Sequence, residues 1–270
     1  NGITNFVSLL DNIMVGRLGT EQMSSVSIVN QLIFVYNLCL FGGLAGAGIF
    51  TAQYFGLKDD EGIRYTFRYK IWMSMILTIA SIAIFLMFGD QLIQLYLSGS
   101  SDGGDLAATL AYGRKYLRIM LLGIPAFMIM QIYASTLREC RETLVPMKAG
   151  VVAIFVNLVF NYLLIFGKFG FPQLGVAGAA IATVIGQWTG AFLGLYFNEK
   201  HNPDVQFGRR YAKLDRGIVT GILTVGIPSI IMNSIGSIMN FGMNQILQGF
   251  NETATSVFGI YFKLQSFFFM

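Results

Sequence analysis

Residues 22–57 form the longest uncharged stretch of the chain and read QMSSVSIVNQLIFVYNLCLFGGLAGAGIFTAQYFGL. A helix needs about 20 apolar residues to cross the hydrocarbon core of a bilayer, so this stretch is long enough to do so. Backbone groups in hydrocarbon must be satisfied within the spanning structure, and the stretch lacks the short apolar and polar alternation of barrel strands. It therefore predicts a membrane-spanning helix.

Similar uncharged stretches recur along the chain, and two further apolar segments stand at its ends. The internal stretches are 71–89, 119–137, 149–167, 169–198 and 217–251, and the end segments are 1–16 and 253–270. Together they predict an all-α integral membrane protein, a polytopic helical bundle with eight transmembrane segments. Because both end segments stop inside apolar sequence, we expect the chain to be part of a longer protein.

The composition agrees with this fold class. Of the 270 residues, 54% are hydrophobic and only 12% are charged, and the mean hydropathy is +0.62. A soluble chain carries about 25% charged residues, so a soluble domain, a coiled coil and a disordered chain are excluded. The net charge of +4 comes from basic residues that lie between apolar runs, and it does not predict a nucleic-acid partner. Cys39 and Cys140 belong to no metal or redox motif and are predicted to be free thiols.

Lysine and arginine residues concentrate in three connections between the predicted helices. Residues 58–70, 138–148 and 200–216 hold twelve of the 18 basic residues (four, three and five). Because positive charge is enriched in cytoplasmic connections, these three connections and the N-terminus are predicted to be cytoplasmic. The expected location is the plasma (inner) membrane, crossed several times. A basic cluster at 114–118 does not fit this count.

The longest charged connection, residues 199–216, divides the predicted helices into two lobes. Residues 1–198 hold six helices and form an N-lobe, and residues 217–270 form the start of a C-lobe. When the sequence of the first segment is aligned with that of the seventh, Asn12 stands opposite Asn244. Since six is an even number, the second lobe begins with the topology of the first, which predicts parallel repeats related by an axis along the membrane normal.

Asp11 is the one acidic residue of 14 that lies well inside a predicted helix. An ionised carboxylate at that depth costs several kcal/mol, so it must face a cavity or a partner, and burial favours uptake of a proton. A carboxylate in a transport pathway is the default interpretation. The alternative is an acid that is paired to a helix end for structural reasons.

Asn157 and Asn161 stand four residues apart and therefore share one helix face. Their amide oxygens can coordinate Na⁺ or bond a protonated Asp11, while the alternative is an ordinary interhelical hydrogen bond. Thr183, on the next predicted helix, adds a hydroxyl near the same cavity. No metal site is certain from the sequence, although Na⁺ is possible at these four residues.

Other features of the apolar segments indicate packing, bending and a polar vestibule. Small residues recur every four positions from Gly178 to Gly194, which predicts close approach of a neighbouring helix. Pro125 and Pro228 remove backbone hydrogen bonds and are expected to kink their helices. An aqueous cavity for substrate is expected to be lined by the polar residues Gln31, Tyr36, Asn37, Gln53, Asn233, Asn240 and Asn244.

Enzyme motifs are absent from the sequence. It contains no Walker A loop, no dinucleotide-binding fingerprint, no GxSxG elbow and no HExxH. We therefore expect no catalytic residues, no enzymatic activity and no cofactor.

Several motifs together resemble the multidrug and toxic compound extrusion (MATE) transporters, from residue 1 to about residue 270. They are DNIMVGRLG at 11–19, SSVSI at 24–28, GLKD at 56–59, RETLVP at 141–146, NLVFNYLLIFG at 157–167 and LGVAGAAIAT at 174–183. The resemblance implies twelve helices in two lobes of six, of which this chain holds the N-lobe and two helices of the C-lobe. It also implies export of organic cations or other amphiphilic toxic compounds, driven by inward movement of H⁺ or Na⁺.

The resemblance further implies roles for individual residues. Asp11 matches the coupling acid of the family on its first helix, Asn157 matches an Asn on the fifth helix, and Thr183 matches a Thr on the sixth. Asn161 stands where many members have Asp, and this departure favours H⁺ over Na⁺ as the coupling ion. The expected partners are small organic substrates and the lipid bilayer, and the protein is expected to be monomeric.

Two other functions are compatible with a polytopic helical fold. A lipid-linked oligosaccharide flippase of the same superfamily should line its cavity with several Arg or Lys residues for a pyrophosphate, and the uncharged runs contain none. A receptor with seven or eight helices and no transport activity is the other alternative, and a complete gene with about four more helices would exclude it.

Overall fold

The computed structural model describes residues 14–98, 106–170 and 172–201, together with residues 217, 219–222, 224, 228, 231, 232, 235, 239, 243 and 246. All regular secondary structure in this part of the chain is helical, as predicted. The helices are α2 (Thr20–Leu57), α3 (Asp60–Ser98), α4 (Leu106–Met120), α5 (Ile124–Glu139), α6 (Leu144–Phe166) and α7 (Val176–His201).

Four of these helices are each long and apolar enough to cross a membrane, and a bent pair of helices is long and apolar enough, when taken together, for a fifth crossing. The single crossings are Glu21–Leu57, Asp60–Leu95, Leu144–Phe166 and Val176–Asn198. The bent pair joins Ala107–Met120 to Ile124–Glu139 at an angle of 49°. These crossings correspond to predicted segments two to six. Segment 1–16 lies almost wholly, and segment 253–270 wholly, outside the described residues, so the count of eight stays a prediction.

The structure corrects two predicted boundaries. Residues 60–70 were assigned to a charged connection but form the first turns of α3, because the chain reverses within two residues after α2. Lys58 closes α2 in the left-handed conformation, with φ 58°, and the Asp59 carboxylate then accepts a hydrogen bond from the backbone N–H of Gly62 (3.1 Å). A side-chain acceptor at this position satisfies one of the free N–H groups of a helix start.

The predicted segment 119–137 is likewise part of a longer crossing that contains a break. Pro125 occupies the first turn of α5, directly after the turn that ends α4. Its missing N–H cannot continue the hydrogen-bond ladder of α4, so the kink predicted at Pro125 is confirmed. Arg114, from the basic cluster that the charge count leaves unexplained, forms an ion pair with Asp90 of α3 (2.7 Å).

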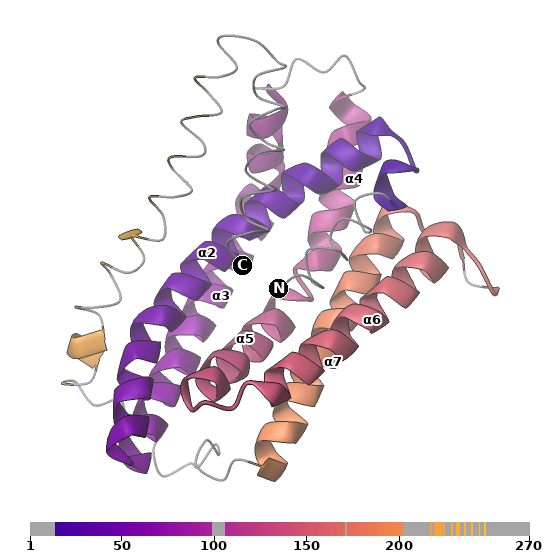
Figure 1. Ribbon diagram of the computed structural model, residues 1–270. Coiled ribbons are helices and arrows are strands. Elements are labelled where there is room, and N and C mark those ends of the chain that lie inside the picture. Colours follow the sequence, from indigo (N-terminus) through magenta and orange to yellow (C-terminus); the bar gives the residue numbers. More distant parts are fainter. Residues whose placement is uncertain are drawn as a thin grey trace.

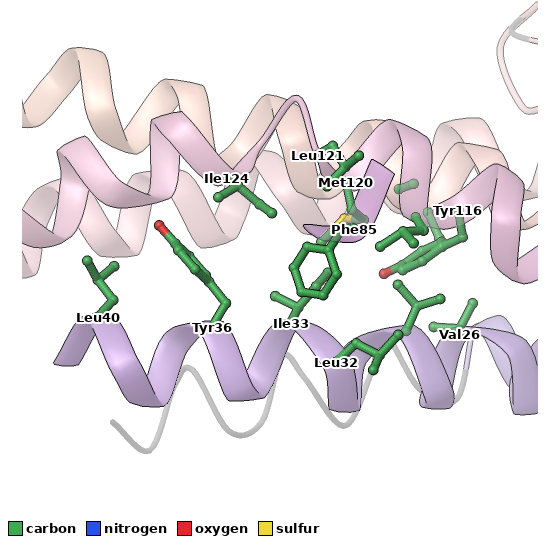
Figure 2. Close-up of a cluster of buried hydrophobic side chains, with 14 of the residues drawn as sticks. Val26, Leu32, Ile33, Tyr36, Leu40, Phe85, Tyr116, Met120, Leu121 and Ile124 are labelled. Atoms are coloured by element: carbon green, nitrogen blue, oxygen red, sulfur yellow. The ribbon is translucent and has the colours of Figure 1, made fainter. Parts of the chain in front are cut away.

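The helices lie side by side in one bundle (Figure 1), in which α2 and α3 form one side, α6 and α7 the other, and α5 lies between them. Apolar side chains of α2, including Ile33, Tyr36 and Leu40, point towards α4 and α5 in the buried cluster of Figure 2. Large apolar side chains also cover outer faces, such as Met87 on α3, which is 73% exposed, and Phe155 on α6. Apolar outer faces are typical of helices that contact lipid.

The small-residue stripe of α7 packs against α6 and α5, as predicted. A Cβ atom added at Gly178 would lie 2.6 Å from the carbonyl oxygen of Leu164, and one added at Gly186 would lie 2.9 Å from Cβ of Asn157. Both distances are too short for a real contact, so only glycine allows α7 to lie this close to α6.

Candidate functional site

Asn161, Asn157 and Thr183 form a chain of hydrogen bonds that joins α6 to α7. The Asn161 amide donates from Nδ2 to Oδ1 of Asn157 (3.2 Å), and Asn157 donates from Nδ2 to Oγ1 of Thr183 (3.3 Å). The Thr183 hydroxyl in turn donates to the carbonyl oxygen of Ala179 (3.0 Å). The structure therefore brings together three of the four residues that the sequence predicts for ion coupling.

This chain of hydrogen bonds lies inside the apolar part of the bundle. Asn161 is 2% exposed, and Asn157 and Thr183 are half-buried. Burial of an amide is unfavourable unless it is hydrogen-bonded, and the chain of bonds engages the Nδ2 groups of both Asn161 and Asn157. Amide and hydroxyl oxygens are also the ligands that hard cations prefer. The arrangement is thus compatible with a cation site, and with a hydrogen-bonding partner for a protonated acid.

The fourth predicted ion-coupling residue, Asp11, lies outside the described residues. The first described residue is Met14, which lies near the helix that carries the two asparagines. Met14 lines an apolar hollow of about 410 Å³ together with Leu158, Val159, Tyr162, Leu163 and Phe169. The backbone three residues after Asp11 therefore lies beside α6.

The residues predicted to line a substrate cavity occupy different environments. Gln31 and Gln53 are exposed, and Asn37 is half-buried. Tyr36 is buried between α2 and α3, where its hydroxyl shares a hydrogen bond with Thr78 (2.9 Å). The C-lobe candidates Asn233, Asn240 and Asn244 lie outside the described residues.

The sequence analysis missed a buried ion pair between α3 and α5. Lys70 is fully buried; it forms a salt bridge with Glu139 and donates to Oγ1 of Thr136 (3.3 Å). The prediction placed Lys70 in a solvated connection, and this is wrong because α3 begins ten residues earlier. The spacing of Lys70 from Thr66 and Ser74, four residues on either side, was the signal available in the sequence.

This ion pair also bears on the flippase alternative. Two cations among the described residues, Lys70 and Arg68, are buried, contrary to what the uncharged runs indicated. The charge of Lys70 is balanced by the Glu139 carboxylate, so this pair offers no net positive charge to a pyrophosphate. Among the described residues there is no group of three or more His, Cys, Asp or Glu side chains that could hold a metal ion. Cys39 and Cys140 are free thiols, as predicted.

A bundle of lipid-facing helices, with close glycine packing and buried polar groups in its interior, is the architecture of a polytopic membrane protein. The comparisons with known proteins identify the type of membrane protein. The chain belongs to the MatE family, whose model matches residues 1–163. Members of this family are membrane transporters and not enzymes.

Curated relatives match almost the whole chain. It is 29% identical to the probable multidrug resistance protein NorM of Thermotoga maritima, over 99% of this chain and 56% of that protein. It is 27% identical to the multidrug export protein MepA of Staphylococcus haemolyticus, over 98% of this chain and 55% of that protein. The chain thus spans about half the length of these relatives.

Solved structures share the fold. One is the outward-facing conformation of a multidrug resistance MATE family transporter of the MOP superfamily. It gives a TM-score of 0.84 at 23% identity, and the match covers 98% of this chain and 57% of the chain of that transporter. The inward-facing conformation of such a transporter gives a TM-score of 0.74 at 24% identity, with coverage of 93% of this chain and 55% of that one. The fold of these structures agrees with the match of the MatE model to residues 1–163, which confirms the family expected from the sequence motifs.

Proposed function

We propose that the protein is a secondary active transporter that exports organic cations or other amphiphilic toxic compounds in exchange for H⁺ or Na⁺. The observation that carries this proposal is the hydrogen-bonded chain of Asn161, Asn157 and Thr183 inside an apolar bundle of the MatE family. The relatives named above are described as multidrug resistance and multidrug export proteins, which supports the same substrate class.

Asp11 is the proposed ion-binding acid. It precedes Met14, which lines an apolar hollow together with residues of the helix that carries Asn157 and Asn161. A carboxylate held in this apolar region gains most from a proton or a cation, because either removes the cost of a buried charge. Asn161 supplies no negative charge where many members of the family have Asp, and this favours H⁺.

The transport cycle requires two states of the whole protein. We propose that the N-lobe (1–198) and the C-lobe that starts at 217–270 move against each other around a central cavity, in a monomer of twelve helices in the plasma (inner) membrane. In this cycle the N-terminus and the connection 199–216 face the cytoplasm. An ion shifts the balance between two such states only by its difference in affinity for them, and a few kcal/mol are enough.

The proposal is tested in cells that express the full-length protein, with efflux of a fluorescent organic cation as the readout. Asp11→Asn keeps the shape of the side chain and removes its charge, and we expect it to lower efflux at least tenfold at equal expression. Asn12→Asp moves the charge by one position and should not restore efflux when it is combined with Asp11→Asn. Unchanged efflux of the Asp11→Asn variant would remove Asp11 from the mechanism.

A further inference from the structure

Four polar side chains form a line along the inner face of α3. Thr66, Lys70, Ser74 and Thr78 follow one another at intervals of four residues, and none of them is more than 4% exposed. Residues four apart share one helix face. A buried polar line is unfavourable in an apolar crossing unless every group is bonded or hydrated, so its presence calls for a physical reason.

Three members of the line have partners on neighbouring helices. Thr66 accepts a hydrogen bond from Thr51 of α2 (3.1 Å), and Thr78 shares one with Tyr36 of α2 (2.9 Å). Lys70 bonds Glu139 and Thr136 of α5. The line therefore runs through the interior of the bundle, between α2, α3 and α5.

Ser74 differs from the other three members. Its side chain is fully buried, yet its hydroxyl oxygen has no hydrogen-bond partner among the described residues. In the same region, Oδ1 of Asn37, the neighbour of Tyr36, is also buried without such a partner. Unsatisfied polar groups inside proteins are commonly bonded by internal water molecules.

The spacing of the line matches a file of water molecules. Four residues advance an α-helix by about 6 Å, whereas a hydrogen bond between two oxygens spans about 2.8 Å. Neighbouring members are therefore too far apart for direct contact, but one bridging water covers the distance. From Thr66 to Thr78 the line extends about 18 Å, more than half of the hydrocarbon thickness of about 30 Å.

We propose that the α3 line binds a file of internal water and carries protons between the level of Tyr36 and the Glu139 end of the bundle. The inference rests on the proposed function, with H⁺ as the coupling ion. Glu139 is the outlet, because its side chain is 18% exposed while Lys70 is fully buried. In the topology proposed above, this outlet is near the cytoplasmic side, because Glu139 ends α5.

Proton transfer through the ion pair conserves charge and electrons. The Lys70 ammonium passes one proton to the Glu139 carboxylate, which leaves a neutral amine and a carboxylic acid. The amine lone pair then takes a proton from the water beside Ser74, and that water regains a proton passed along the file from the Tyr36 end. The O–H bond of Glu139 breaks and releases its proton to water at the outlet. One proton has crossed, the ion pair is restored, and nothing is oxidised or reduced.

The surroundings of Lys70 and Glu139 lower the free-energy cost of the intermediate in which both side chains are neutral. A low-dielectric interior penalises both charges of a buried ion pair, so the cost of neutralising them together is reduced. The other titratable or charged groups whose fields reach Lys70 are Arg138 and Cys140. Arg138 is exposed, and its Nε donates to the carbonyl oxygen of Ala134 (2.9 Å). Its positive charge near the outlet favours departure of a proton.

The test uses the full-length protein in proteoliposomes that contain a pH-sensitive dye, with proton flux measured when an organic cation is added. Ser74→Ala interrupts the line, and we expect a proton flux about tenfold lower, as a barrier higher by ~1.4 kcal/mol would give. The thermal midpoint should not fall and the Kd for the organic cation should not rise, because the variant removes a hydroxyl that lacks a protein partner. Ser27→Ala, an exposed serine of α2, is the matched control and should behave like the unmodified protein.

Thr78→Val, which keeps the side-chain shape, provides a second interruption of the line and should also slow proton flux. Wild-type flux in both Ser74→Ala and Thr78→Val would overturn the inference and leave the proposed export function intact. Export driven by Na⁺ with no proton flux would overturn it as well. Absence of any export by the unmodified protein would instead refute the proposed function.

Discussion

Alanine at Gly178 places a methyl group inside the contact between α6 and α7. The added Cβ would lie 2.6 Å from the carbonyl oxygen of Leu164 and 2.7 Å from its carbonyl carbon. Because both atoms belong to the backbone of α6, neither can turn aside as a side chain does. Non-bonded carbon contacts are most favourable at about 3.5–4.0 Å, so the two helices must separate by about 1 Å at this point.

The expected loss of stability follows from two opposed terms. Overpacking of this kind costs ~1–3 kcal/mol, and the higher helix propensity of alanine returns up to ~1 kcal/mol. With the full propensity term the net loss is about 0–2 kcal/mol, and the loss relative to a Gly→Ala change that meets no contact is ~1–3 kcal/mol. The separation also draws Thr183 away from Asn157, whose hydrogen bond of 3.3 Å is already long. We therefore expect Gly178→Ala to lower transport as well as stability.

The assay is thermal unfolding of the purified full-length protein in detergent, with Gly150→Ala as the matched control. A Cβ atom at Gly150, in the first turns of α6, would meet nothing within 4 Å, so this variant should be neutral or more stable by up to ~1 kcal/mol. Each kcal/mol corresponds to about 2–4 °C in proteins of a few hundred residues. A thermal midpoint of Gly178→Ala equal to or above that of Gly150→Ala would refute the argument.

Two further predictions concern stability. Lys70→Met leaves the Glu139 carboxylate, which is 18% exposed, without its cation. Removal of one partner of a fully buried pair costs ~3–5 kcal/mol, and partial exposure reduces this cost, so we expect a loss of up to ~3 kcal/mol in the free energy of unfolding. The double variant Lys70→Met with Glu139→Leu should recover most of it, and equal thermal midpoints for the single and double variants would contradict this. Arg141 adopts the left-handed conformation, with φ 61°. Glycine adopts this conformation without strain, so Arg141→Gly should raise the thermal midpoint by an amount equivalent to about 0.5–1 kcal/mol. A lower midpoint would show that the Arg141 side chain has a stabilising role.

The membrane crossings were predictable where charge and hydropathy agree. The uncharged run 22–57 matches α2 (Thr20–Leu57) closely, and the other described crossings follow similar runs. The start of α3 could not be found in this way. Its first turns carry Arg64, Arg68 and Lys70, and a charge count assigns such residues to a connection. Helix α3 nevertheless begins at Asp60, because a two-residue turn follows α2 and the Asp59 carboxylate satisfies a backbone N–H of its first turn.

The candidate site was predictable only in part. The spacing of Asn157 and Asn161 places both amides on one face, and the structure joins them by a hydrogen bond. The ion pair of Lys70 with Glu139 was not predictable, because its partners are 69 positions apart in the sequence and no local pattern connects them. The role of Asp11 is still a prediction, since the residue lies outside the described part of the chain.

The packing of α7 and the chemistry of α6 depend on the same residues. Gly186 lies against Asn157, where an added Cβ would come within 2.9 Å, and Thr183 lies less than one turn before Gly186 on α7. A side chain at Gly186 would therefore push Asn157 away from the hydroxyl that it bonds. The glycine stripe, which a sequence reading treats as packing alone, thus sets the geometry of the proposed ion site. It follows that substitutions in the stripe should change ion affinity even where the folded bundle survives.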